Sequence, residues 1–446
     1  MESTRTDHLP KKAMRSTRRE RVAWYLYDFG NSAYAAVVLL AVYSAYFQDQ
    51  VVGGAEGSRL WGLSLGIAML VVAIISPILG AIADFSGAKK RFLFFFTSLA
   101  CVGTLLLFFV GPGDVFTGML FFIMAEIGYR SAQVFYNSLL PEIANEEDIG
   151  RISGLGWAIG SFGGIVCLVI VLALVLLVGG TFVVRLSFII TAAFYLLSSL
   201  PVFFWLKERG EPQKTDEDKS YLQIGFKRVV DTFKAVRNFR EFIKFMIAFL
   251  IYNDGIIMAL DFAAIIGAVL YGMDQQQLIL LMIAVQVTSV VGAYLFGYLA
   301  DRIGPKLSII LSLIAMIGAV VAMLFNQTLT GYFIIASFAG FALTGVQSVS
   351  RTIIGLFSPP GQSAEFYGFF AVAGRTSSFI GPTIYGILAA EVAQLYMARG
   401  VDAITAEQTG QRAALISILA FLIVGFVALL AVNERKAKED ALKAVI

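Results

Sequence analysis

The chain has 446 residues, of which 58% are hydrophobic and only 15% are charged, with a formal net charge of +3. No soluble fold buries that much apolar side chain in this length, so the composition indicates an all-α polytopic membrane protein. Its two cysteines, Cys101 and Cys167, lie within apolar segments, and its one histidine, His8, lies in a polar tail. We therefore expect no disulfide framework, no metal site, no cofactor and no nucleic-acid partner.

Twelve apolar segments are long enough to cross a bilayer, which takes about 20 residues. We expect helices at 22–47, 59–83, 91–111, 115–139, 152–178, 182–206, 241–269, 276–300, 306–325, 330–356, 365–389 and 412–432. They form two six-helix halves, 22–206 and 241–432, joined by a polar linker at 207–240. A basic tail at 1–21 precedes the first half, and a second tail at 433–446 follows the other.

Lysine and arginine mark the cytoplasmic side of a membrane protein. They gather in both tails, in the linker and in three loops on the same side of the membrane, whereas the opposite loops contain few. We therefore expect both termini in the cytoplasm. Within the linker, apolar residues recur at helical spacing over 222–237, with basic residues between them. This pattern predicts either an amphipathic helix on the membrane face or an ordinary cytoplasmic helix.

A charged loop between apolar helices occurs twice, as GAIADFSGAKKR from Gly80 and as GYLADRIGPKLS from Gly297. Corresponding residues of the two copies are 217 positions apart, close to half of the chain. Such a repeat indicates an internally duplicated membrane protein. The loop residues expected to form a gate are Gly80, Asp84, Gly87 and Lys89 in the first copy, and Gly297, Asp301, Arg302, Gly304 and Lys306 in the second.

This loop resembles the G-x-x-x-D-[RK]-x-G-[RK]-[RK] signature of the major facilitator superfamily. The resemblance implies a 12-helix major facilitator fold with two pseudo-symmetric six-helix halves. Phe85 stands where the signature has a basic residue, whereas the second copy keeps Arg302. We therefore expect Asp301 and Arg302 to hold the closed cytoplasmic gate, and Asp84 to hold it more weakly.

Charged side chains within a bilayer cost about 2.5–3.5 kcal/mol each at a helix centre, so those that remain face partners or a cavity. The segment 115–139 carries one polar stripe, formed by Glu126, Arg130, Gln133 and Asn137. The segment 330–356 carries a counterpart that includes Gln347 and Arg351. These stripes predict either a substrate site, with Arg for an anion and Glu for an ammonium group or a proton, or a buried structural ion pair.

Three intramembrane carboxylates, Asp28, Asp254 and Asp261, can exchange a proton. Asn31 lies near Asp28 in the first helix, and Arg375 lies well inside a later one. For Asp28 the alternative is a capping or pairing role near the cytoplasmic end of its helix. The glycines between 150 and 164 favour close helix packing over a phosphate loop. No nucleophile–base pattern is visible, so we expect no catalytic residues and no enzyme.

The segments WYLYDFGNSAY from Trp24, YNDG from Tyr252 and GRTSSFIGP from Gly374 resemble the vacuole-effluxer-like family. This family joins the fungal autophagy-related vacuolar amino-acid effluxer to many bacterial proteins. The resemblance implies a secondary active transporter, since the family is expected to export amino acids out of the vacuole into the cytosol. With the carboxylates, it predicts a proton-coupled monomer in the bacterial inner membrane that binds a small solute. The alternatives are an exporter of drugs, lipids or sugar conjugates, and a receptor or scaffold that does not transport.

Overall fold

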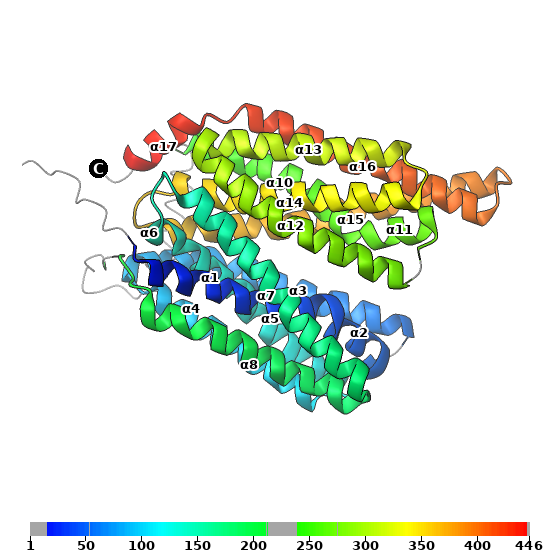
Figure 1. Ribbon diagram of the computed structural model, residues 1–446, viewed down its shortest axis with the longest axis horizontal. Helices are drawn as coiled ribbons and strands as arrows, with labels where there is room; N and C mark the ends of the chain where they lie inside the picture. The colour runs from blue at the N-terminus through cyan, green and yellow to red at the C-terminus, as the bar shows by residue number, and fades with distance from the viewer. Residues whose placement is uncertain (1–15, 53, 211, 213–238, 274, 444–446) are drawn as a thin grey trace, which may run out of the picture.

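The computed structural model describes residues 16–52, 54–210, 212, 239–273 and 275–443. All regular secondary structure in these ranges is helical, and there is no strand among the described residues (Figure 1). The helix expected over 222–237 lies outside the described residues.

The N-terminal half begins with α1, which starts earlier than the sequence indicates. The Thr17 side chain accepts a hydrogen bond from the backbone of Glu20, and the Glu20 carboxylate accepts one from the backbone of Thr17, which together fix the helix start. The α-helices of this half are α1 (Arg18–Tyr34), α2 (Tyr43–Tyr46), α3 (Gly54–Ser86), α4 (Lys89–Leu106), α5 (Val115–Ser138), α6 (Leu140–Ile143), α7 (Ile149–Val178) and α8 (Thr181–Trp205). Two π-helical stretches, Ala35–Ala41 and Phe47–Val52, flank α2, so the first membrane segment is irregular.

The C-terminal half differs from expectation at three places. The segment expected at 241–269 is broken at Phe262 into two helices, and the last membrane helix already begins at Ala403, where the Asp402 side chain caps it. A further helix lies within the expected tail at 433–446. The helices are α10 (Arg240–Asp261), α11 (Ala263–Tyr271), α12 (Gln275–Ile303), α13 (Pro305–Phe325), α14 (Leu329–Phe357), α15 (Ser363–Ala398), α16 (Ala403–Leu430) and α17 (Glu434–Lys443).

Ten segments among the described residues are long and apolar enough to cross a membrane. The long helices α5 and α15 are not among these ten, and α5 carries the polar stripe that contains Glu126 and Arg130. Counting these two long helices as well, each half would have six membrane segments. The architecture is therefore multi-pass and all-α, and it is consistent with the expected twelve.

Each half has its own hydrophobic core. Trp24, Phe96 and Phe122 belong to the N-terminal core, and Phe245 and Met316 to the C-terminal core. In Figure 1 the N-terminal half lies below the C-terminal half, and α6 and α17 lie at the same end, where α1 begins. We call this end the termini face. The two cores are largely separate, and they meet where Val134 of α5 joins the C-terminal cluster and Ala364 of α15 joins the N-terminal one.

Small residues bring the two halves together. On α7, a Cβ atom added at Gly154 would lie 2.3 Å from the carbonyl oxygen of Ala293 on α12. On α3, a Cβ atom added at Gly80 would lie 2.4 Å from the carbonyl oxygen of Ala364 on α15. No side chain fits at either position, so glycine permits both helix pairs to pack backbone against backbone.

Candidate functional site

Asp84 joins the halves at the termini face. Its carboxylate accepts a hydrogen bond of 2.8 Å from the backbone N–H of Glu365, in the first turn of α15. Lys89 lies 3.2 Å from the same carboxylate and also donates to Glu142 and to Ser363 of the opposite half, both at 2.8 Å. Asp84 and Lys89 are both buried. A buried carboxylate therefore caps a helix of the other half, where the positive end of the helix dipole favours it.

Asp301 makes the equivalent contact on the other side of the repeat. Its two carboxylate oxygens accept hydrogen bonds of 2.7 and 2.8 Å from the backbone N–H groups of Gly150 and Arg151, in the first turn of α7. Arg302 lies over the ring of Tyr298 at 5.3 Å. Although Phe85 replaces the usual basic residue, Lys89 supplies a positive charge next to Asp84. The Asp84 carboxylate is also more buried than that of Asp301. This geometry removes the reason for expecting Asp84 to hold the gate more weakly.

Arg351 of α14 enters the N-terminal half. Its guanidinium lies 3.7 Å from the Asp28 carboxylate and 3.4 Å from the side-chain oxygen of Asn137. It donates to the hydroxyl of Ser153 at 3.0 Å and to the carbonyl oxygen of Ser153 at 2.5 Å. Three rings surround it, with centroids 5.0 Å (Trp24), 5.9 Å (Tyr136) and 5.5 Å (Trp157) away. The structure therefore brings predicted residues of both polar stripes together, at the interface of the halves.

The outer part of the α5 stripe holds the pair predicted at Glu126 and Arg130. The Arg130 Nε donates to the Glu126 carboxylate at 2.5 Å. The Glu126 side chain is fully buried, whereas Arg130 remains 20% exposed. Tyr34 lies beside Glu126, and the Arg130 guanidinium lies 5.1 Å from the ring of Tyr129. Arg130 is therefore the more exposed member of this pair.

A chain of hydrogen bonds links α5 to α1 and α8. Gln133 donates to Asn31 at 3.4 Å, and Asn31 donates to the Tyr195 hydroxyl at 2.9 Å. Tyr195 and Tyr27 share a hydrogen bond of 2.9 Å, and Tyr27 contacts Thr97 at 2.8 Å. The predicted residues Asn31 and Gln133 thus lie in contact, whereas Tyr27, Thr97 and Tyr195 escaped prediction because hydroxyl residues are common in apolar segments.

The polar residues of α10 face several directions. Asp254 is fully buried; one carboxylate oxygen accepts from the backbone N–H of Gly381 at 2.9 Å, and the other has no partner among the described residues. Asn253 accepts from Gln347 at 2.8 Å, in parallel to the Asn31–Gln133 contact. Asp261 is exposed at the end of α10. Of the predicted residues, Arg375 lies within α15, and its side chain is outside the described residues.

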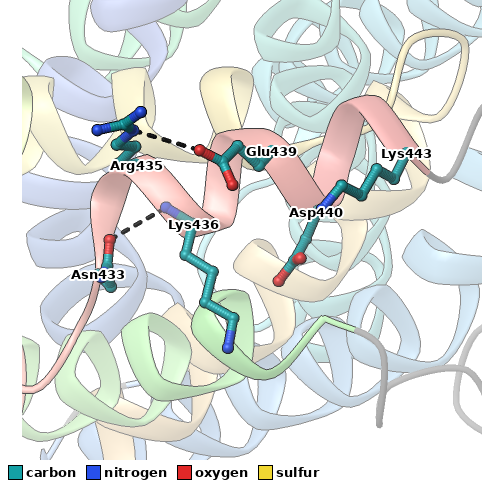
Figure 2. A pocket seen from close by; sticks show the side chains of 6 residues that line it. All are labelled: Asn433, Arg435, Lys436, Glu439, Asp440 and Lys443. Atoms are coloured by element: carbon teal, nitrogen blue, oxygen red, sulfur yellow. Dashed lines mark hydrogen bonds and ion pairs between the residues drawn. The ribbon is translucent and has the colours of Figure 1, made fainter.

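The surface of α17 carries a shallow depression at the termini face (Figure 2). Its lining consists of charged and polar residues of this helix and the residue before it: Asn433, Arg435, Lys436, Glu439, Asp440 and Lys443. None of the predicted site residues lines it. On the other side of the helix Lys438 contacts Glu146 of the N-terminal half at 2.6 Å. This ion pair links α17 to the N-terminal half, and the depression lies apart from the predicted site residues.

The model of the family described as vacuole effluxer Atg22 like matches residues 61–150 and 146–442. The chain belongs to this family. It is 28% identical to an uncharacterized MFS-type transporter, YxiO, of Bacillus subtilis (strain 168), over 95% of this chain and 97% of that protein. It is 25% identical to autophagy-related protein 22 of Yarrowia lipolytica, over 74% of this chain and 70% of that protein. The Atg22-like resemblance seen in the helix motifs is thereby confirmed.

Solved structures confirm the major facilitator fold. The proton:xylose symporter XylE superposes with a TM-score of 0.70 at 14% identity, covering 96% of this chain and 98% of that chain. A bacterial homologue of the iron transporter ferroportin, in an outward-facing state, superposes with a TM-score of 0.69 at 13% identity, covering 93% and 99%. This Atg22-like protein is accordingly a multi-pass membrane transporter of the major facilitator superfamily, a class of carriers and not of enzymes.

Proposed function

We propose that this Atg22-like protein is a secondary active transporter for a small solute that bears a carboxylate, with amino acids as the first choice. The observation that carries the proposal is Arg130. Its Nε is held by Glu126, whereas its terminal nitrogens have no hydrogen-bond partner among the described residues and the side chain is 20% exposed. A guanidinium presented in this way can bind a carboxylate through two parallel hydrogen bonds.

Glu126 has a different role from the one that its charge alone indicates. Since its side chain is fully buried behind Arg130, it does not face the ammonium group of a solute. It instead neutralises Arg130 and fixes the plane of the guanidinium. An arginine with a buried counter-ion is less costly to keep in a membrane when no solute is bound.

The closed termini face supports transport by alternating access. Asp84, Asp301 and Arg351 all bind across the interface there, and each of these contacts must break for the opposite side to open. We place this face in the cytoplasm because α17 and the described ends of the basic N-terminal tail and of the linker, at Ser16 and Lys207, lie there. With relatives named as vacuole effluxers, we propose export across the bacterial inner membrane by a monomer.

Proton coupling is assigned to Asp254. Its second carboxylate oxygen lies in the interior without a partner among the described residues, so a proton can be taken up there without breaking an ion pair. Asp28 already faces Arg351, and Asp261 is exposed, so both are less suited than Asp254 to carry the coupled proton. Intramembrane carboxylates of this kind are typical of proton relays in transporters.

Uptake of labelled amino acids into proteoliposomes tests the carboxylate site. Arg130→Lys keeps the charge but loses the planar pair of donors, so we expect at least about a tenfold loss of apparent affinity, equivalent to about 1.4 kcal/mol. The control is Arg399→Lys, since Arg399 is exposed and lies over Tyr396 at the far side. If Arg130→Lys transports as well as the control, Arg130 does not bind the solute.

Counterflow exchange separates coupling from binding at Asp254. Asp254→Asn removes the proton acceptor, so we expect gradient-driven accumulation to disappear while exchange of solute across the membrane continues. The two assays use the same proteoliposomes, with and without a pH gradient. Accumulation by Asp254→Asn with the parent's pH dependence would exclude Asp254 and make Asp28 the next residue to test.

A further inference from the structure

The contacts of the Arg351 guanidinium form a cage whose members all belong to the other half of the protein. Its six members lie on α1, α5 and α7, whereas Arg351 lies on α14. We call them the cation cage: Trp24, Asp28, Tyr136, Asn137, Ser153 and Trp157. Arg351 is 3% exposed, so its charge is almost fully withdrawn from solvent and is balanced by the cage.

The chemistry of the cage is that of a site for an organic cation. It offers one carboxylate, at 3.7 Å, and uncharged oxygen acceptors on Asn137 and Ser153. The aromatic faces add an attraction for a cation that grows when the site is dry. A carboxylate with aromatic walls and neutral acceptors suits a guanidinium or an ammonium group, and it would repel an anion.

The cage is built independently of its occupant. The Trp24 indole N–H donates to the carbonyl oxygen of Tyr136 at 3.0 Å, and the two rings stack with centroids 4.5 Å apart. Glycines of α7 leave room for the walls: a Cβ atom at Gly156 would lie 2.3 Å from the Trp24 ring, and one at Gly160 would lie 2.9 Å from the Asp28 carboxylate carbon. These contacts lie within one half, so they persist when Arg351 withdraws.

We infer that the cation cage is a binding site for the ammonium or guanidinium group of a solute, which Arg351 fills while the termini face is closed. When the halves separate at this face, Arg351 leaves with α14, and the cage opens to whatever enters from that side. Its use by a transported solute rests on the proposed function. Asn137 lies two helical turns from Arg130, about 10 Å along α5, so an α-amino acid meets the two sites in succession.

The first experiment uses the unmodified protein and guanidinium chloride as the probe. Spin labels at Glu147 and Glu439, both exposed at the termini face on opposite halves, report the separation of the halves. Free guanidinium binds only the state from which Arg351 has left, so it must increase the population with the longer distance. Urea, a neutral molecule of the same shape, and sodium chloride at equal ionic strength should leave the distance unchanged. A response to all three, or to none, would overturn the inference.

The second experiment measures binding at the cage. Trp24 and Trp157 remain as reporters after Trp61→Phe and Trp205→Phe. In Arg351→Ala we expect a saturable fluorescence change with guanidinium, with a midpoint at least about tenfold below that of the Arg399→Ala control, which keeps Arg351 in place. Adding Asp28→Asn should raise the midpoint by about thirtyfold or more, since a buried cation loses its carboxylate.

Each outcome decides one question. Binding to Arg351→Ala that Asp28→Asn leaves unchanged would show that guanidinium binds elsewhere and would refute the cage. Should Arg351→Ala not fold, the distance measurement in the unmodified protein still decides. Neither measurement needs a transported solute. If guanidinium binds but amino acids are not transported, the proposed function is wrong and the cage is still a cation site.

Discussion

The two carboxylate caps at the termini face invite a matched comparison of Asp84→Asn with Asp301→Asn. Both carboxylates accept from backbone N–H groups in the first turn of a helix of the opposite half. Both substitutions keep one oxygen acceptor and remove the charge. The difference is burial, because Asp84 is only 3% exposed and Asp301 is partly exposed.

The expected magnitudes follow from this burial. A hydrogen bond to a charged group in a dry site contributes about 1.5–3 kcal/mol, so Asp84→Asn should shift the equilibrium toward opening of the termini face by about 2 kcal/mol, or about thirtyfold. Asp84→Asn also leaves Lys89, which donates to Ser363 across the interface, without one of its two carboxylates. At Asp301 a partly exposed cap contributes about 1 kcal/mol, or about fivefold.

The assay is the distance between spin labels at Glu147 and Glu439 in detergent or nanodiscs, with transport measured at equal expression. We expect the longer distance to be more populated in Asp84→Asn than in Asp301→Asn. A larger population of the longer distance in Asp301→Asn would contradict this, and it would indicate that the basic residue replaced by Phe85 matters for the strength of the gate. Equal shifts would show that burial of the cap does not set its strength.

Three further predictions use the same preparation. Gly154→Ala places a Cβ atom 2.3 Å from a carbonyl oxygen of α12 and should favour the longer distance, whereas Gly318→Ala, with open space around it, should not. Lys438→Gln should shift the same equilibrium by less than about fivefold, since the bridge to α6–α7 is a surface ion pair. Cysteines at Gln327 and Glu147 should react with impermeant reagents from opposite sides of the membrane, and labelling from one side would contradict the helix count.

The sequence was sufficient for the fold because the evidence for it is local or repeated. Apolar segments of spanning length and a loop repeated at half the chain predict two halves without any knowledge of contacts. Helix ends were less predictable. Asp402 and Thr17 cap helices earlier than the apolar segments indicate, because a helix continues beyond the membrane wherever its end is satisfied.

For the site, the sequence predicted the residues but not their partners. The stripes on α5 and α14 follow from helical spacing. The spacing does not predict that Arg351 contacts Asp28 of the other half, or that Glu126 is buried behind Arg130. Those facts depend on how the halves pack. The same holds at Asp84: the repeat placed Lys89 among the gate residues without showing that it contacts this carboxylate, and the relative strength of the two caps stays a prediction.

Because α17 contacts both halves, a ligand that binds α17 can regulate the opening of the termini face. Lys438 contacts Glu146 of one half and Glu434 of its own helix, and Glu434 in turn accepts from the backbone of Lys306 in the other half. Burial lowers the pKa of Lys438, but the hydrogen bonds to these two carboxylates outweigh it and raise the pKa, so the ion pairs persist at neutral pH. By thermodynamic linkage, a ligand that prefers α17 in its docked position binds more weakly once the termini face opens, and it hinders that opening by the same free energy.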